Sequence, residues 1–390
     1  YSVTIRVGFI INFKSSSWLG GYNYFKNLFL CLQENNNKKI IPVLITDQHN
    51  NELMEDSIFS KYEIIKTNLV SRSNITQKIF SKVLIIFFGR NFFFDNFLKK
   101  NNIKILSHSG WIGNKSKIKN FPWLPDFQEI HFPENFNFLS KFIRKIRVVF
   151  CNKFSTKILI SSKSVQQDLK TIDVNAYKNS ILIKHSVEIP DFKKLKSMKY
   201  LKKKYKIDNN YYFLPNHYWI HKNHLTVLKA LAIKNNLKKS YQIVSTGSTF
   251  DHRHPNHFFN IKSFIKKHSL EKKYKILKVV PYIDMISLMY YSIALINPSF
   301  SEGWSNTVEQ AKAMKKDTII SNINVHKEQK DKNTILFKPY DYLSLKKILD
   351  KKFLNFLRKK NKFKKDYLNS NKYLRKSFID NYQKSILKFL

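Results

Sequence analysis

One stretch constrains the fold more than any other part of the chain: residues 298–314, which read PSFSEGWSNTVEQAKAM. A short apolar run at residues 293–297 precedes it and predicts a buried strand. The proline that follows ends this strand, because proline has no N–H to donate to a neighbouring strand. Asn306 or Thr307 is expected to cap a helix, and residues 317–321 predict the next strand. The order strand, acidic loop, helix, strand is typical of a parallel α/β sheet, in which ligands bind at the carboxyl ends of the strands.

The side chains of this loop suit a sugar nucleotide. Glu302 offers acceptors for sugar hydroxyls, and Gly303 lets a diphosphate approach the backbone because it has no side chain. The N–H groups at the start of the helix would face that phosphate, and Glu309 and Gln310 lie one turn further, within reach of a ribose. A structural explanation stays open, in which Glu302 caps the helix from outside and Glu309 is a solvated acid of the first turn.

The wider motif, PSxxEGWSxTVExAK, resembles the donor-site signature of retaining glycosyltransferases of family 4, and within that family a bacterial polysaccharide subgroup. The resemblance implies the GT-B fold. It also implies donor contacts from the loop and the helix start, at Gly303, Trp304, Ser305, Asn306 and Thr307. The family has a second Glu eight positions after Glu302, where this chain has Gln310. Either Gln310 or its neighbour Glu309 holds the ribose, and the helical register favours Gln310.

The net charge of +43 is the strongest compositional signal. Such a charge fits nucleic acid or an anionic membrane surface. The excess of Lys accompanies an excess of Asn, Ile, Phe and Tyr along the whole chain, and the A/T-rich codons of these residues are a sufficient explanation. No recognised nucleic-acid-binding module appears, so nucleic acid is not an expected partner.

The cysteines and the apolar runs bear on where the protein works. Cys31 and Cys151 have no paired spacing, which argues against a disulfide framework and a zinc site. No apolar run approaches the roughly 18 residues of a membrane span, and no signal peptide is recognisable before Tyr1. We therefore expect a cytoplasmic protein, with peripheral contact to anionic lipid on the inner face of the membrane as a further expectation.

The first half of the chain begins like a Rossmann domain. Residues 4–11 predict a strand, and a polar loop leads to Gly20 and Gly21 and to a helix over residues 22–31. By the resemblance, these glycines lie beside the acceptor and the donor phosphate. Further strands are predicted at residues 40–46, 83–88 and 103–107.

Residues 108–138 predict a long irregular loop, a kind of segment that is often functional. The part that reads WLPDFQEIHFPE, residues 123–134, resembles the WIPDFQH segment of the same subgroup. The resemblance implies that Asp126 is a catalytic and acceptor-binding residue and that His131 binds the acceptor. Glu129 stands where the subgroup commonly has His. A turn-forming role for Asp126 and a packed, hydrogen-bonded His131 stay open as structural alternatives.

Residues 136–150 predict a basic amphipathic helix. Its apolar residues are Phe138, Phe142, Ile146 and Val149, and its cations are Lys141, Arg144, Lys145 and Arg147. Such a helix lies on a membrane interface or packs on its own sheet as a surface helix. Near residue 190 the composition shifts into a Lys-rich stretch, where we place the domain boundary.

The second half opens with a strand predicted at residues 211–214. Residues 215–224, PNHYWIHKNH, then resemble the NxxWxHKNH motif of the subgroup. In the wider family an Arg and a Lys five residues apart hold the diphosphate here; His217 takes the Arg position and Lys222 keeps the Lys. A cation at this place stabilises the departing nucleotide. Such close His and Lys groups also suit a metal, but the phosphate-site context favours diphosphate. Residues 241–247 and 274–280 predict further strands, the first ending at Gly247 in the donor site.

The predicted fold class is α/β, with the GT-B arrangement of two Rossmann-like domains facing across a cleft. Residues 1–190 form the acceptor domain, residues 191–371 the nucleotide-sugar domain, and residues 372–390 a helix that packs back on the first domain. The resemblance implies a hexosyltransferase-type enzyme (EC 2.4) that moves a sugar from a nucleoside-diphosphate sugar to a glycan or lipid-linked acceptor with retention of configuration. Its catalytic residues would be Glu302, Lys222 and Asp126. No Asp-x-Asp motif occurs, so we expect no metal and no cofactor beside the donor itself.

Two other functions remain open. A non-catalytic sugar-nucleotide-binding homologue is consistent with the departures at Glu129 and Gln310. A basic nucleic-acid-binding protein would explain the charge, but not the Glu-Gly loop at Glu302.

Overall fold

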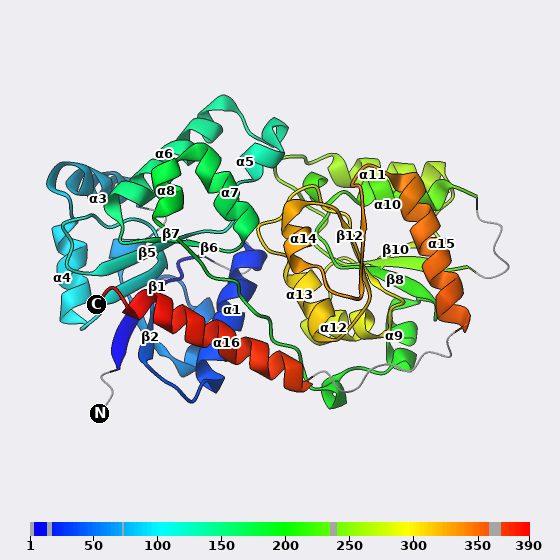
Figure 1. The fold of residues 1–390 in the computed structure, drawn as a ribbon, viewed down its shortest axis with the longest axis horizontal. Helices are drawn as coiled ribbons and strands as arrows, with labels where there is room; N and C mark the ends of the chain where they lie inside the picture. Colours follow the sequence, from blue (N-terminus) through cyan, green and yellow to red (C-terminus); the bar gives the residue numbers. More distant parts are fainter. Residues whose placement is uncertain (1–3, 14–17, 72–73, 235–239, 359–367) are drawn as a thin grey trace. The chain divides into compact units, whose positions relative to one another are not determined.

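The computed structural model describes residues 4–13, 18–71, 74–234, 240–358 and 368–390. The chain forms two compact units, each built around a parallel sheet (Figure 1). Unit 1 falls within Tyr1–Phe127, Asn137–Glu188 and Tyr373–Leu390, and unit 2 within Gln128–Phe136 and Ile189–Lys372. The prediction of two Rossmann-like domains is thereby confirmed.

In the described residues, the sheet of unit 1 has seven parallel strands in the order β3-β2-β1-β4-β5-β6-β7. These strands are β1 (Ile5–Ile10), β2 (Ile40–Thr46), β3 (Glu63–Lys66), β4 (Ile105–Ser109), β5 (Lys119–Leu124), β6 (Ile158–Ile160) and β7 (Ser180–Leu182). The helices of unit 1 are α1 (Leu19–Glu34), α2 (Glu52–Glu55), α3 (Ile75–Phe88), α4 (Phe92–Lys100), α6 (Phe138–Phe154), α7 (Lys163–Ile172), α8 (Val174–Lys178) and α16 (Leu368–Leu387), with short 3-10 turns at Phe59–Lys61 and Asn68–Val70.

Aromatic side chains of α1 and α16 pack on the sheet of unit 1. Phe9 of β1 meets Phe29 of α1 edge to face, with ring centroids 5.0 Å apart. Tyr382 of α16 is fully buried, and its hydroxyl donates to Oγ of Ser107 in β4 at 2.8 Å. Each fully buried aromatic ring contributes roughly 2 kcal/mol of hydrophobic stabilisation. The C-terminal helix is therefore part of the core of unit 1.

The strand predicted at residues 83–88 is wrong, because this run is the second half of helix α3. The side chain of Asn74 caps the helix by accepting from the N–H of Gln77 at 3.0 Å. Gly89 ends it in the left-handed conformation, with φ of 73°, and its N–H donates to the carbonyl of Ile85. A short continuous apolar run does not distinguish a buried strand from a helix, so the cap residues decide.

The loop predicted at residues 108–138 contains a strand that the sequence did not reveal. Strand β5 lies between β4 and β6 although it includes Pro122, a residue that is rare in central strands. The pairing with β4 is irregular at this place: Ser107 pairs with Phe121 and Ser109 with Pro122. The shift in register accommodates the residue that lacks an N–H.

In the described residues, unit 2 has a six-stranded parallel sheet in the order β10-β9-β8-β11-β12-β13. Its strands are β8 (Tyr211–Leu214), β9 (Gln242–Ser245), β10 (Tyr274–Ile276), β11 (Leu295–Asn297), β12 (Thr318–Ser321) and β13 (Thr334–Phe337). Its helices are α5 (Gln128–His131), α9 (Met198–Tyr205), α10 (His224–Ala232), α11 (His257–Lys267), α12 (Tyr282–Tyr291), α13 (Asn306–Ala313), α14 (Asn324–Gln329) and α15 (Tyr342–Arg358), with 3-10 turns at Pro133–Asn135, Phe192–Lys194 and Ile220–Lys222.

Residues 128–136 pack in unit 2, whereas the sequence grouped them with the first domain. Gln128 accepts from Nη1 of Arg253 at 3.2 Å, and Asn135 accepts from Nε2 of His254 at 2.6 Å. Both contacts join residues that are more than a hundred positions apart, so no local pattern reveals them. The chain crosses from unit 1 to unit 2 and back before its main boundary near residue 189.

None of the helices in the described residues has the length and apolar character needed to cross a membrane.

Candidate functional site

The carboxyl ends of β8 and β11 mark the candidate site of unit 2. In a sheet of this order the chain runs outward in one direction from β8 and in the other from β11, and ligands bind where the two directions diverge. The loop after β8 covers residues 215–223, and the loop after β11 covers residues 298–305. Both motifs that resemble the family therefore meet at the switch point of one sheet.

Hydrogen bonds join the loop after β8 to the end of β11 and to the loop that follows it. Nδ2 of Asn216 donates to Oδ1 of Asn297 at 3.0 Å, and both side chains are buried. The N–H of Phe300 donates to the carbonyl of His221 at 2.8 Å. Because buried polar groups are costly unless they are paired, these bonds fix the relative position of the loops.

An ion pair between Lys222 and Glu302 lies at the centre of the site. Nζ of Lys222 is 2.7 Å from Oε1 of Glu302, and the side chains are 14% and 9% exposed. The same oxygen accepts from Oγ of Ser299 at 2.7 Å and from Nδ2 of Asn297 at 3.4 Å. Burial alone would raise the pKa of Glu302, but the charge of Lys222 and, next, the neighbouring His326 lower it to about 2. Glu302 is therefore a carboxylate at neutral pH.

Three histidines lie near the pair, His221 and His326 buried and His217 half-buried, and all are neutral at pH 7. Burial, reinforced by the charge of Lys222, lowers the pKa of His217 to about 4, that of His221 to about 3 and that of His326 to about 4. His217 is therefore no cation at the position of the family's Arg. Its Nδ1 accepts from the N–H of Ser248 at 2.8 Å, so it positions the loop after β9.

Arg253 supplies a cation that the sequence motifs did not indicate. Its Nε lies 3.3 Å from Oδ1 of the buried Asp251, and its guanidinium lies 5.8 Å from the ring centroid of Trp219. Its charge contributes to the lowered pKa of His221, after burial and Lys222. The loop after β9 thus brings an arginine to the side of the site where His217 is neutral.

The helix after Glu302, α13, begins one residue earlier than predicted. Its N-cap residue is Ser305 rather than Asn306 or Thr307, and the Ser305 side chain makes no capping hydrogen bond. The hydroxyl of Ser305 instead accepts from Nδ2 of Asn297 at 2.9 Å. The other predicted donor residues of this segment are each partly exposed: Gly303, Trp304, Asn306 and Thr307.

Gln329 is a second residue that the sequence did not reveal. Its Oε1 accepts from the N–H of Ser305 at 3.2 Å, and its Nε2 donates to the carbonyl of Ser305 at 3.0 Å and to Oε1 of Glu309 at 2.9 Å. Lys312 also donates to that oxygen of Glu309, at 2.8 Å. The Glu309 carboxylate is therefore already committed to holding the start of α13.

Gln310 has the opposite environment. Its side chain is 5% exposed, and its Nε2 lies 3.4 Å from the hydroxyl of Tyr282. In the part of the chain that the structure describes, its Oε1 is buried and has no hydrogen-bond partner. Of the two residues weighed for the ribose, Gln310 is the one whose acceptor oxygen is buried without a partner in the described residues.

Gly247 allows the loop after β9 to approach the loop after β8 closely. Its φ is 144°, and a Cβ at this position would lie 2.5 Å from the carbonyl oxygen of Asn216 and 2.8 Å from Cα of His217. Any other residue would push the loop that carries His217 and Lys222 away from the strand ends. The structure thus brings Gly247 next to the predicted diphosphate segment.

In unit 1, the predicted residues gather around Trp18. Gly20 and Gly21 lie in the first turn of α1 rather than in a loop, and a Cβ on Gly21 would lie 2.4 Å from the Trp18 ring. Trp18 stacks on Trp123, with centroids 5.8 Å apart. The structure therefore joins the glycines to the segment that includes Asp126, which follows β5 and is half-buried.

His131 lies in a different unit from Asp126. It ends helix α5 of unit 2 and is exposed, so it is not packed in a core. The two predicted acceptor residues are therefore not brought together within one unit. The described residues contain no group of three or more His, Cys, Asp or Glu side chains that could hold a metal ion.

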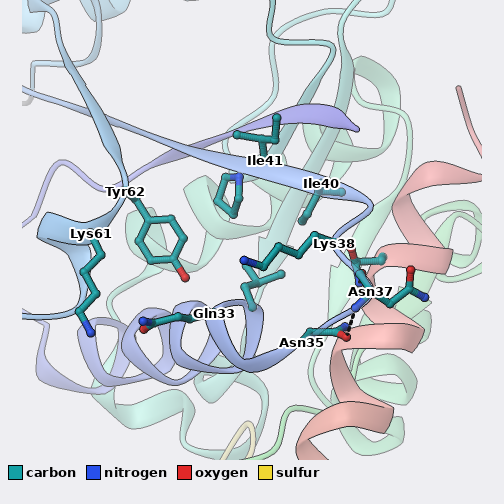
Figure 2. Close-up of a pocket in the computed structure, with 11 residues that line it drawn as sticks. Gln33, Asn35, Asn37, Lys38, Ile40, Ile41, Lys61 and Tyr62 are labelled. Carbon is teal, nitrogen blue, oxygen red and sulfur yellow. Dashed lines mark hydrogen bonds between the residues drawn. The ribbon is translucent and has the colours of Figure 1, made fainter. Parts of the chain in front are cut away.

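A cavity of about 250 Å³ lies elsewhere, between α1, β2 and α16 of unit 1 (Figure 2). Ile40, Ile41 and Pro42 line it, at the amino end of β2. Ligands of parallel sheets bind at the carboxyl ends, so this cavity is separate from the predicted site. Its cations are Lys38 and Lys61, and Figure 2 shows them on either side of Tyr62.

The fold is GT-B-like: it has two parallel sheets with these strand orders. The Lys222–Glu302 pair lies at the switch point of the sheet in unit 2. Solved structures agree on the fold. A glycosyltransferase from Rickettsia africae has a TM-score of 0.64 at 16% identity, covering 99% of this chain and 97% of its own. Anabaena HepE, in complex with UDP and glucose, has a TM-score of 0.64 at 13% identity, with 98% and 95% covered. WaaG, a glycosyltransferase involved in lipopolysaccharide biosynthesis, has a TM-score of 0.61 at 11% identity, with 96% and 95% covered.

Residues 197–366 match the family described as glycosyl transferases group 1. Unit 2 therefore carries a glycosyltransferase group 1 domain, and this domain implies a transferase of class EC 2.4. No curated protein matches the sequence.

Proposed function

We propose that this protein is a retaining, metal-independent glycosyltransferase of family 4, which transfers a hexosyl group from a nucleoside-diphosphate sugar to a glycan or lipid-linked acceptor. The observation that carries the proposal is the buried pair of Lys222 and Glu302, which lies at the switch point of a glycosyltransferase group 1 domain. It joins the two motifs that were assigned to the diphosphate and to the donor sugar. Work on the cytoplasmic side of a membrane is part of this proposal.

The chemistry follows from these side chains. Lys222 binds the diphosphate and stabilises the charge that develops as the glycosidic bond breaks. Glu302, which is ionised because its pKa is about 2, accepts hydrogen bonds from the hydroxyls of the sugar and fixes its orientation. The acceptor oxygen forms a bond to the anomeric carbon, the bond to the diphosphate oxygen breaks, and the acceptor proton passes to the departing diphosphate. Asp126 orients the acceptor.

Neutral histidines suit this role. His217 and His221 are uncharged, so they donate or accept single hydrogen bonds without competing with Lys222 for the diphosphate. Arg253 adds a second cation beside His221. We propose that Arg253, and not His217, supplies the charge that the family obtains from its Arg.

A UDP-sugar is the first donor to test, because HepE is in complex with UDP and with UDP-glucose. The experiment screens UDP-, GDP- and ADP-sugars for release of the nucleoside diphosphate, with and without a chelator. We expect hydrolysis of one donor class, unchanged by the chelator and lowered by Lys222→Ala. Activity that is lost on chelation and restored by Mn²⁺ would overturn the metal-free mechanism.

The same screen separates the proposal from its alternative. A non-catalytic homologue would bind the nucleotide, seen as a rise in unfolding temperature, without releasing diphosphate from any sugar donor even when acceptors are present. Tight nucleic-acid binding at physiological salt, with no response to nucleotides, would reject both.

A further inference from the structure

Helix α3 of unit 1 is apolar nearly all round and yet lies exposed. Among its residues, only Ile85 is buried. Seven large apolar side chains are between 41% and 77% exposed: Ile75, Ile79, Phe80, Val83, Ile86, Phe87 and Phe88. A helix that is hydrophobic all round is normally covered, and an exposed apolar patch of this kind marks an interaction site.

The start of α4 continues the same surface. Phe92 and Phe93 are 37% and 61% exposed. The ring of Phe80 lies 6.2 Å from that of Phe93, and the ring of Phe88 lies 5.9 Å from that of Phe92, between centroids. Helix α3 and the first turn of α4 therefore form one apolar face, which we call the α3–α4 face. Figure 1 shows α3 and α4 on the outside of unit 1.

The segment that forms this face, residues 74–101, carries five cations and one acid, and the acid is hidden. The charged residues of segment 74–101 are Lys78, Lys82, Arg90, Asp95, Lys99 and Lys100. Asp95 is 2% exposed, and its Oδ1 accepts from the hydroxyl of Ser116 at 2.9 Å. The guanidinium of Arg90 lies 4.4 Å from the ring centroid of Phe92. What the surface presents is thus apolar area with positive charge at its edge.

This combination selects one kind of partner. Apolar side chains with basic neighbours bind the boundary between headgroups and acyl chains in a bilayer, and each cation adds about 1 kcal/mol at an anionic lipid surface. A second copy of the chain would bring the same cations against it, and the net charge of +43 opposes such a pairing.

We propose that the α3–α4 face inserts into the surface of an anionic lipid bilayer. The insertion does not depend on sugar transfer, so its failure and the failure of the proposed enzymatic function can be told apart. It would hold unit 1, which carries the predicted acceptor residue Asp126, at the membrane. Phe87, at 77%, has the largest exposed fraction among the exposed apolar side chains of α3.

The test measures binding of the full chain to sedimenting vesicles of phosphatidylglycerol and phosphatidylcholine. The test variant replaces Ile79, Phe80 and Phe87 with Ser. The matched control replaces three equally exposed apolar residues of unit 2 with Ser: Phe259, Val279 and Leu343. Because all six side chains are more than half exposed, both variants should keep the fold, and circular dichroism with thermal unfolding checks this.

We expect the test variant to lose about tenfold or more in vesicle partitioning and the control less than about twofold, since the loss follows from apolar area withdrawn from the bilayer. Equal losses in the two variants, or no binding of the parent chain, would overturn the proposal. A dimer seen by light scattering in the parent chain, but not in the α3 variant, would also overturn the proposal, because a second copy of the chain would then cover the face.

A local readout distinguishes insertion from loose attraction. In Phe87→Trp, brominated lipid should quench the added fluorescence, whereas it should not quench that of Phe259→Trp. Quenching of both tryptophans to the same degree, or of neither, would contradict insertion through this face.

Discussion

Nζ of Lys222 lies 2.7 Å from Oε1 of Glu302, in a pair whose side chains are 14% and 9% exposed. The two residues are 80 positions apart and come from loops on opposite sides of one switch point. A buried pair is maintained when further hydrogen bonds satisfy its charges, and Ser299 supplies one to Glu302. An incoming diphosphate would compete with Glu302 for Lys222, which couples donor binding to the position of the carboxylate.

Glu302→Gln should remove most transferase activity while the fold is kept. The amide keeps the size of the side chain and one acceptor but loses the charge that orients the sugar. Glu302→Ala is less suitable, because it leaves a buried, unpaired lysine and costs about 3 kcal/mol of unfolding free energy. The measurement is turnover with the active donor, beside urea unfolding, and the exposed Glu271→Gln is the control. Near-normal turnover in Glu302→Gln would reject the assigned role.

The ribose contact is tested by two reciprocal substitutions. If Gln310 holds the ribose, Gln310→Glu should keep or strengthen donor affinity, because a charged acceptor makes the stronger hydrogen bond. Glu309→Gln should then act mainly on stability, since that carboxylate already accepts from Gln329 and Lys312. Calorimetric affinities for the nucleoside diphosphate decide the matter. A large loss of affinity in Glu309→Gln, with no response at position 310, would reverse the assignment.

Sequence patterns located Glu302 and Lys222, but not the hydrogen-bonded side chains that hold their loops in place. Residues 40–46 and 211–214 were predicted with their observed bounds, because β-rich runs flanked by polar turns read clearly. Glu302 and Lys222 each stand in a recognisable local motif. Gln329 and Arg253 do not: Gln329 binds Ser305, 24 positions away, and Arg253 binds Gln128, 125 positions away. Asn216 belongs to the NxxWxHKNH motif, but the motif does not reveal its partner Asn297, 81 positions away.

The acid stability of unit 2 should follow its buried histidines. Burial is the largest cause of a lowered pKa in four of them: His217, His221, His224 and His326, at about 4, 3, 3 and 4. Each binds a proton more readily in the unfolded chain. The unfolding free energy therefore has its highest value above about pH 6.5 and falls as the pH drops toward 4. The loss between pH 7 and pH 5 should be roughly 1–2 kcal/mol for each buried histidine.

Urea unfolding at several pH values measures this dependence. His326→Gln should reduce the slope with pH, and the exposed His252→Gln should leave it unchanged. A stability that is flat between pH 7 and pH 5 would show that these histidines are not buried as described.

The basic helix α6 makes the last prediction. Its first half exposes Phe138, Leu139, Phe142 and Ile143, and its N-cap residue Asn137 accepts from the N–H of Ser140. Neutralising its four cations, Lys141, Arg144, Lys145 and Arg147, should weaken binding to anionic vesicles. Each cation contributes about 1 kcal/mol at such a surface, and this attraction decays within about a Debye length of the surface. The loss should shrink as salt rises.

A matched set of cations shows whether the α6 patch is special. Lysines within residues 350–375 are less suitable as a control, because this segment falls partly outside the described residues. Four exposed lysines of α11 and α15 replace them: Lys266, Lys267, Lys347 and Lys351. Neutralising them should reduce vesicle binding less than the α6 change does, because they are divided between two helices of unit 2, whereas the α6 cations lie together within residues 141–147. Equal losses from the two sets would mean that the attraction comes from the diffuse charge of +43 and not from a localised patch.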